Sequence, residues 1–210
     1  MSQGLIKEKN LIMAARVLSI IFNPFYLPLV GLILLFWCSY LSMLNESYKW
    51  LILLTTYLFT ILIPTYLIRV YNTYQGKRLF KLGPRERRMV PYIISIISYF
   101  ACYYLLAYFH IPHFINLILV AALAIQITCA IINVWWNIST HSAGIGGVTG
   151  ALIVFSVFFG FYLLWWLSLT LIIAGLVGSS RLILRRHTLA QVVVGYLLGL
   201  VITPLIIIFI

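Results

Sequence analysis

Two histidines, each at the start of an apolar stretch and close to hydroxyl or arginine side chains, are the residues of this 210-residue chain best suited to chemistry. His141 follows Ser139 and Thr140, and His187 follows a segment that contains Arg181. Guanidinium groups bind phosphate oxygens through paired hydrogen bonds, and a cluster of them stabilises a phosphoryl transition state. One imidazole can attack phosphorus while a second protonates the leaving oxygen. These residue types therefore predict a site for a phosphate-bearing molecule.

Three polar segments carry this candidate site, and the apolar stretches between them place all three on one face of a membrane. Two apolar stretches separate segment 71–90 from segment 137–142, and two more separate the latter from segment 179–187. Because two crossings return a chain to the side that it left, the three segments emerge together. They contain both histidines and nine cations: Lys77, Arg78, Lys81, Arg85, Arg87, Arg88, Arg181, Arg185 and Arg186. Any single cation is more readily explained by membrane topology than by catalysis.

The composition excludes a soluble, disordered or fibrous protein. Hydrophobic residues make up 64% of the chain, charged residues make up 8%, and the mean hydropathy is +1.11. A soluble domain has about 25% charged residues. We therefore expect an all-α fold, a polytopic transmembrane helix bundle in a lipid bilayer. Loops that set membrane orientation explain the net charge of +11 better than nucleic-acid binding does.

Apolar segments long enough to cross about 30 Å of hydrocarbon define the expected helices. The step from Asn23 to Pro24 interrupts the first segment, because proline disfavours helical backbone at the preceding residue. Six helices cross if this segment only lies at the surface or re-enters, and seven cross if it spans. Residues 143–178 would form a helix of about 54 Å, so we expect a break near Gly160. The expected segments are 11–40, 50–70, 91–109, 114–136, 141–159, 162–178 and 188–210.

The remaining candidate residues are expected to be structural. The glycines of segment 144–150 stand at one-turn spacing, which is typical of close helix–helix contact in membranes. His110 and His113 belong to a short interfacial turn on the face opposite the candidate site. The three cysteines lack metal-ligand spacing, so we expect no disulfide and no metal site, and no motif indicates a cofactor: Cys38, Cys102 and Cys129.

The residues around both histidines are similar, in order and spacing, to the motifs of a known family. Residues 138–141, Ile-Ser-Thr-His, resemble the second motif of the type 2 phosphatidic acid phosphatase superfamily, usually Pro-Ser-Gly-His. Ser180 and Arg181, followed by five residues and His187, resemble the third motif of that family, Ser-Arg-x5-His-x3-Asp.

The first motif of the family, Lys-x6-Arg-Pro, is matched more loosely. Lys81 and Arg88 have the required spacing, but methionine follows the arginine and the proline comes only at Pro91. The resemblance covers about residues 77–191. We accordingly treat residues 1–210 as one integral membrane domain, in which a motif-bearing core, 77–210, follows N-terminal helices within 11–70.

The resemblance implies a metal-independent lipid phosphatase that works through a phosphohistidine. It implies that His187 is the nucleophile and that His141 protonates the leaving oxygen. It also implies that the phosphate is held by the backbone N–H groups around Thr140 and by four side chains: Lys81, Arg88, Ser139 and Arg181. The implied substrate is a lipid phosphate, such as phosphatidate, a phosphatidylglycerol phosphate, an isoprenyl phosphate or diphosphate, or a lipid A phosphate.

The family's aspartate, four residues after the nucleophile, is replaced by Gln191, and the chain contains no aspartate. Residues four apart lie on one helix face, so we expect the amide oxygen of Gln191 to accept the imidazole N–H of His187. An amide cannot neutralise an imidazolium, and an amide in place of such a carboxylate costs about 10⁴ in rate in serine proteases. Two alternatives therefore stay open: a weakened or inactive relative that binds or transports a phospholipid, and a lipid phosphotransferase.

The orientation of the site depends on the first segment. If all seven helices cross, the N-terminal cations share the side of the site, and the positive-inside rule places both in the cytoplasm. The family resemblance implies instead a site that opens to the periplasm of a bacterial inner membrane. We expect the latter, and the sequence defines no oligomeric state.

Overall fold

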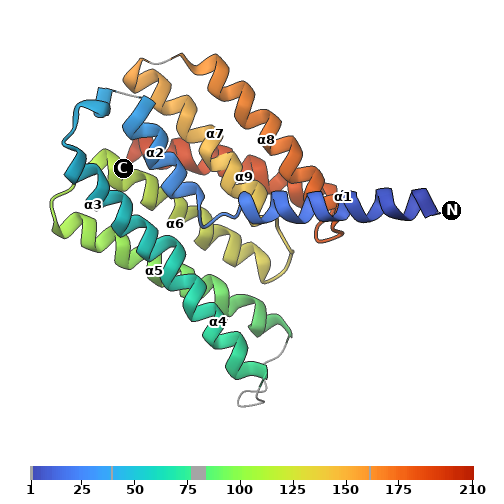
Figure 1. Cartoon of the computed structure of the whole chain (residues 1–210). Coiled ribbons are helices and arrows are strands. Elements are labelled where there is room, and N and C mark those ends of the chain that lie inside the picture. The colour runs from blue at the N-terminus through green and yellow to red at the C-terminus, as the bar shows by residue number, and fades with distance from the viewer. Residues whose placement is uncertain (1, 39, 77–83, 161) are drawn as a thin grey trace.

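The computed structural model describes residues 2–38, 40–76, 84–160 and 162–210, and every regular element in these ranges is helical. Figure 1 shows the helices gathered in one bundle, from which the N-terminal helix projects. This confirms the expected all-α bundle. The elements are α1 (Ser2–Ile21), α2 (Leu27–Cys38), the 3₁₀ turn η1 (Tyr40–Met43), α3 (Glu46–Tyr57), the π turn η2 (Leu58–Leu62), α4 (Ile63–Gly76), α5 (Pro84–Tyr108), α6 (His113–Asn133), α7 (Thr140–Phe159), α8 (Leu163–Ile183) and α9 (Leu189–Phe209).

Six helical segments of the described ranges are long and apolar enough to cross a membrane. The first combines α3, η2 and α4 into 29 residues, and the other five come one from each later helix. The chain is thus a multi-pass integral membrane protein. The six segments are Glu46–Tyr74, Met89–Tyr108, His113–Asn133, Thr140–Phe158, Leu164–Ile183 and Leu189–Phe209.

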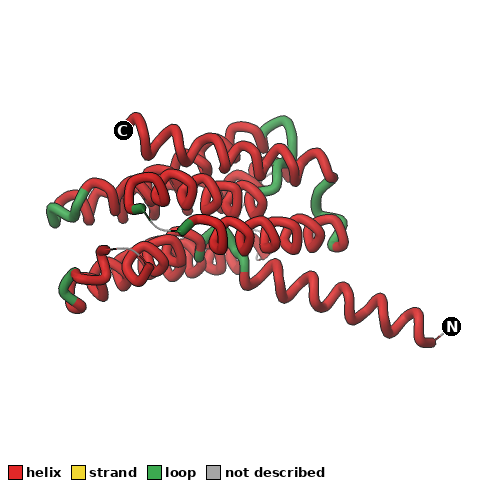
Figure 2. Tube along the Cα trace, turned by 90° about the horizontal axis from the view of Figure 1, so that it is seen from above, coloured by secondary structure: helices red, strands yellow, loops and turns green. Residues whose placement is uncertain are grey.

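The first apolar segment breaks at Asn23 and Pro24, as the sequence predicts. The side-chain oxygen of Asn23 accepts a hydrogen bond from the backbone N–H of Phe25, at 3.2 Å, in the turn between α1 and α2. Figure 2 shows α1 extending away from the other helices. The 12 residues of α2 span about 18 Å, which is less than the hydrocarbon thickness.

Although it is short, α2 leads from one end of the bundle to the other. A Cβ atom on Gly144, near the start of α7, would meet side-chain atoms of Leu27 at 2.4 Å and of Pro24 at 3.5 Å, so α2 begins beside α7. At its other end, the ring of Trp37 lies 6.3 Å from the ring of Trp50 in α3. The start of α3 and the start of α7 are at opposite ends of the bundle, since three crossings separate them.

Two predicted helix boundaries are wrong. α5 begins at Pro84 rather than at residue 91, because proline is favoured at the first position of a helix, and α5 continues through Pro91. α8 continues to Ile183 rather than stopping at residue 178, so Arg181 lies on a helix and not in a loop. The predicted break near Gly160 is confirmed, since Gly160 ends α7 with a φ of 61°, a left-handed conformation that favours glycine.

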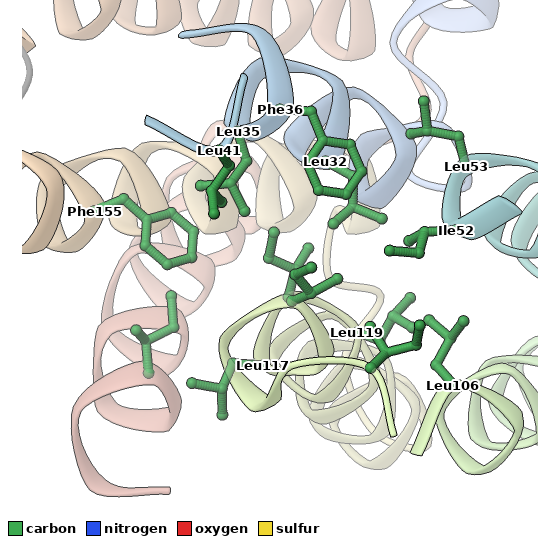
Figure 3. Close-up of a cluster of buried hydrophobic side chains, with 14 of the residues drawn as sticks. Leu32, Leu35, Phe36, Leu41, Ile52, Leu53, Leu106, Leu117, Leu119 and Phe155 are labelled. Atoms are coloured by element: carbon green, nitrogen blue, oxygen red, sulfur yellow. The ribbon is translucent and has the colours of Figure 1, made fainter. Parts of the chain in front are cut away.

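Apolar side chains from α2, α3, α5, α6, α7 and α9 form the main core (Figure 3). Leu32 and Phe36 of α2 are fully buried there, as are Ile52 of α3 and Leu119 of α6. The short helix α2 is therefore an integral part of the bundle and not a surface helix.

The closest contact between two helices joins α7 and α9, and glycines make it possible. A Cβ atom on Gly146 would lie 2.0 Å from the backbone oxygen of Tyr196, and one on Gly199 would lie 1.9 Å from that of Ala143. This confirms the prediction that the glycines of segment 144–150 serve helix packing. The matching glycines of α9, Gly195 and Gly199, went unnoticed in the sequence because they stand alone among large apolar residues.

Candidate functional site

Both histidines lie where the starts of α7 and α9 meet. The loop before α7 is tied to α9 by a backbone hydrogen bond of 3.3 Å, from the N–H of Ser139 to the carbonyl oxygen of Gln191. This bond and the glycine contact fix the two helix starts side by side. His141 lies in the first turn of α7, and His187 lies just before Thr188, which caps α9.

The ring of His187 is oriented by a backbone carbonyl. Its Nδ1 atom lies 3.0 Å from the carbonyl oxygen of Asn137. A carbonyl oxygen can only accept a hydrogen bond, so Nδ1 carries the proton and donates it. In the neutral ring the lone pair is then on Nε2. Asn137 thus fixes the tautomer that a nitrogen nucleophile requires.

The surroundings of His187 favour its neutral form. Burial is the largest cause that lowers the pKa of His187 below its ordinary value, and the positive charges of Arg181 and Arg186 lower it further. The carbonyl of Asn137 and the side chain of Gln191 act in the opposite direction but do not reverse the shift. His187 is therefore uncharged at neutral pH.

His141 faces α1, whose last turn passes over the site. The Nε2 atom of His141 lies 3.1 Å from the backbone oxygen of Ser19, so Nε2 carries the proton of the neutral ring. Its Nδ1 atom is buried and has no hydrogen-bond partner among the residues that the structure describes. A general acid needs a second proton on Nδ1, because loss of the Nε2 proton then leaves a neutral imidazole, and Ser19 holds the place of an accepting oxygen.

Arg181, in the last turn of α8, binds the same residue of α1. A terminal nitrogen of its guanidinium donates a hydrogen bond to the hydroxyl oxygen of Ser19. The Nε atom of Arg181 is buried and lacks a partner within the described ranges. Buried donors are almost always satisfied, so an unsatisfied one indicates a place for an acceptor such as a phosphate oxygen.

Gln191 acts on His187 through its side chain and also caps α9. The side-chain oxygen of Gln191 accepts a hydrogen bond of 3.0 Å from the backbone N–H of Thr188. The backbone N–H of Gln191 donates a hydrogen bond of 3.4 Å to the hydroxyl oxygen of Thr188. The two residues form a capping box at the start of α9. The carbonyl of Asn137 is a further partner of the His187 ring, which the sequence did not predict.

Ser139 and Thr140 are brought to the site, but not as free phosphate ligands. Ser139 is fully buried, caps α7 and has its hydroxyl oxygen 2.9 Å from that of Ser142. Thr140, the first residue of α7, lies near the hydroxyl of Tyr92 in α5. Its backbone remains at the positive end of the α7 dipole, where anions are favoured.

The side chains of Lys81 and Arg88, the two cations of the first motif, are not among those that the structure describes. Lys81 lies outside the described residues. Arg88 belongs to α5, one helical turn before Tyr92, but its side chain is likewise outside the description. Their expected contacts with phosphate stay predictions.

An apolar cavity of about 380 Å³ opens next to His141 and Thr140. Pro24 and Leu27 line it on one side, and Tyr99 lines it from α5. Its few polar side chains are scattered among apolar residues of α2, α5, α6, α7 and α9. A cavity of this kind suits an apolar chain whose polar end lies at His141.

Within the described ranges, no three histidine, cysteine, aspartate or glutamate side chains lie close enough to share a metal ion. The described side chains that form the site are His141, His187 and Arg181. Sequence reasoning missed Ser19, because a serine in an apolar N-terminal helix gives no signal. It also missed the role of the Asn137 carbonyl, since every residue carries one.

Comparison of the chain with protein-family models, with curated proteins and with solved structures finds no match.

Proposed function

We propose that this integral membrane protein is a lipid phosphate phosphatase that works through a phosphohistidine intermediate. The observation that carries the proposal is the pairing of His187, whose Nε2 lone pair is left free by the Asn137 carbonyl, with the nearby donors of His141 and Arg181. The backbone hydrogen bond from Ser139 N–H to Gln191 O brings the helix starts that carry the two rings side by side. The motif resemblance assigns the same residues to the same roles.

In the proposed reaction, Nε2 of His187 attacks phosphorus, a P–N bond forms and the bond from phosphorus to the lipid oxygen breaks. His141 acts in its imidazolium form, which the negative charge of the bound phosphate favours; it gives one proton to the leaving oxygen and becomes neutral, and Arg181 stabilises the charge on the phosphoryl oxygens. Water then attacks the phosphohistidine and gives a proton to the neutral His141; the P–N bond breaks, inorganic phosphate leaves, His187 is neutral again and His141 is again an imidazolium. The substrate displaces Ser19, and its apolar chain occupies the cavity beside His141.

The test is phosphate release from a panel of lipid phosphates by the purified full-length protein. We expect His187→Ala to lower the rate by about 10³-fold or more, because the nucleophile is lost. His113→Ala is the matched control, since His113 is an exposed histidine outside the site, and it should leave the rate unchanged. Release that persists in His187→Ala would overturn the mechanism.

A lipid-binding relative without turnover is the second candidate. The hydrogen bonds of Ser19 favour it: the backbone oxygen of Ser19 pairs with the ring N–H of His141, and its hydroxyl oxygen pairs with the guanidinium of Arg181. Absence of phosphate release from every lipid of the panel, together with saturable lipid binding, would support this candidate instead.

We also propose that the site faces the cytoplasm, which differs from the orientation that the family resemblance implies. Of the eleven Lys and Arg residues in the described ranges, ten lie on α1 or near the helix ends on the side of the site, and only Lys49 lies at the other end. Without Arg88 and Arg181, which are assigned to phosphate, eight cations remain on that side. Cations are retained on the cytoplasmic side of membrane proteins.

Cysteine labelling in a cysteine-free background tests this orientation. An impermeant maleimide should label Ser47→Cys, at the start of α3, from outside intact cells, and should label Asn72→Cys, at the end of α4, only after permeabilisation. Both positions are exposed and lie at opposite ends of one continuous helix. The reverse pattern would place the site on the periplasmic side.

A further inference from the structure

A second hollow, separate from the apolar cavity, lies between α1 and the segment 181–186. It has a volume of about 1020 Å³, and neither histidine of the candidate site lines it. Four guanidinium groups and one carboxylate do: Arg16, Arg181, Arg185, Arg186 and Glu8. We call this hollow the arginine groove.

The charges of the arginine groove are not balanced within the described part of the protein. The one ion pair found there joins Lys49 and Glu46, at the other end of the bundle. None of the four arginines therefore has a carboxylate partner among the described residues. Like charges held close together repel each other, and an anionic ligand would relieve this repulsion.

The turn that ends α8 presents Arg185 to the groove. Arg185 has a φ of 51°, in the left-handed region where glycine is usual after a helix. Hydrogen bonds from Arg185 N–H to Leu182 O, at 2.9 Å, and from Arg186 N–H to Arg181 O, at 3.1 Å, close the end of α8 around it. This helix-ending turn accounts for the conformation and leaves the Arg185 side chain exposed at the groove.

The groove is also apolar along α1. Leu11, Ile12 and Ile20 line it opposite the arginines. A ligand that satisfies both sides carries a phosphate-type anion on an apolar body. Guanidinium groups match phosphate oxygens through paired hydrogen bonds.

We propose that the arginine groove binds the phosphate-bearing head group of an anionic phospholipid, beside the candidate site, with which it shares Ser19 and Arg181 but neither histidine. Arg16 of α1 and Arg185 of the α8–α9 turn hold the phosphate from two sides, and the apolar residues of α1 contact the lipid next to its head group. The bound lipid thereby joins α1 to the end of α8. The proposal concerns binding and does not depend on catalysis by His187.

Native mass spectrometry of the full-length protein with phosphatidylglycerol or phosphatidylcholine tests the proposal. We expect selective retention of phosphatidylglycerol and a loss of about tenfold in its affinity in the double variant Arg16→Gln, Arg185→Gln, because two charged hydrogen-bonding partners are removed. Lys9→Gln is the matched control, since Lys9 is an exposed cation of α1 outside the groove and should retain the lipid normally. Glu8→Gln should strengthen binding, because it removes the one carboxylate that lines the groove.

Titration of inorganic phosphate into the protein in phosphatidylcholine nanodiscs distinguishes a lipid from a free phosphate. Phosphate binding that is lost in the double variant would show that the phosphate group alone suffices. Equal retention of both lipids without phosphate binding, or the same loss in Lys9→Gln as in the double variant, would overturn the proposal. The Glu8→Gln result decides the matter if the double variant does not fold.

Discussion

The α7–α9 contact and the α1–α8 contact both end at the candidate site, but they hold it in different ways. Between α7 and α9 the backbones touch, with no room for a Cβ atom on Gly146 or Gly199. α1, by contrast, reaches the site through one residue, Ser19, and most of its large apolar side chains are exposed.

The difference separates the contacts that position the two histidines from the contacts that occupy the hydrogen-bonding groups of His141 and Arg181. The helices α7 and α9 hold both histidines through backbone contacts that cannot change without separating the helices. The contacts of Ser19 are two hydrogen bonds, which a phosphate group can replace with its own oxygens. We infer that α1 is the displaceable element and that the α7–α9 pair is the fixed one.

The largest expected effect follows from filling the α7–α9 contact. In Gly199→Ala, the new methyl group would lie 1.9 Å from the Ala143 oxygen, so the helices must separate. We expect a loss of about 3 kcal/mol or more in stability, together with loss of phosphate release. Heating in detergent followed by size-exclusion chromatography measures the stability.

Gly175→Ala is the matched control for this variant. A Cβ atom on Gly175, in the middle of α8, would meet no atom within 4 Å. Alanine should stabilise a helix at such a position by about 0.5–1 kcal/mol. Equal behaviour of the two variants would refute the view that α7 and α9 form the fixed pair.

The pH dependence of phosphate release should show the next largest effect. Only the neutral form of His187 can attack phosphorus, and its pKa is lowered by burial and by neighbouring arginines. The rate should therefore stay constant at neutral pH and fall about tenfold per pH unit at pH values below the lowered pKa.

The fall of the rate at low pH is the acid limb of the pH profile. Arg186→Gln should move this acid limb to higher pH, because the loss of a nearby positive charge raises the pKa of His187. Lys9→Gln should leave the limb where it is. A limb that lies above pH 7 in the unmodified protein, or that does not respond to Arg186→Gln, would contradict the proposed role of His187.

The smallest effect is expected at α1. Ser19→Ala removes the hydroxyl that binds Arg181, and the substrate then displaces one hydrogen bond fewer. We expect KM for the lipid phosphate to fall by about two- to fivefold, with little change in kcat. Ser168→Ala, which removes an exposed hydroxyl of α8, should change neither constant. A higher KM in Ser19→Ala would show that the hydroxyl binds substrate rather than competing with it.

Local features of the sequence predicted much of the fold. The break at Pro24, the turn at Gly160 and the lengths of the later apolar runs depend on backbone stereochemistry and on hydrocarbon thickness, both of which act on short stretches. The predicted end of α8 was wrong, because polar residues such as Ser180 and Arg181 can either extend a helix or begin the following loop. Only packing against α1 and α9 decides between these possibilities.

The sequence by itself determined that the chain is a bundle of membrane helices, and it predicts that His141, His187 and neighbouring arginines carry its chemistry. Residue types and apolar run lengths carry that information. Tertiary structure decided which atoms face each ring: the Asn137 carbonyl, 50 residues from His187, and Ser19, 122 residues from His141. A backbone carbonyl is the same in every residue, so only the folded chain can select one as a partner.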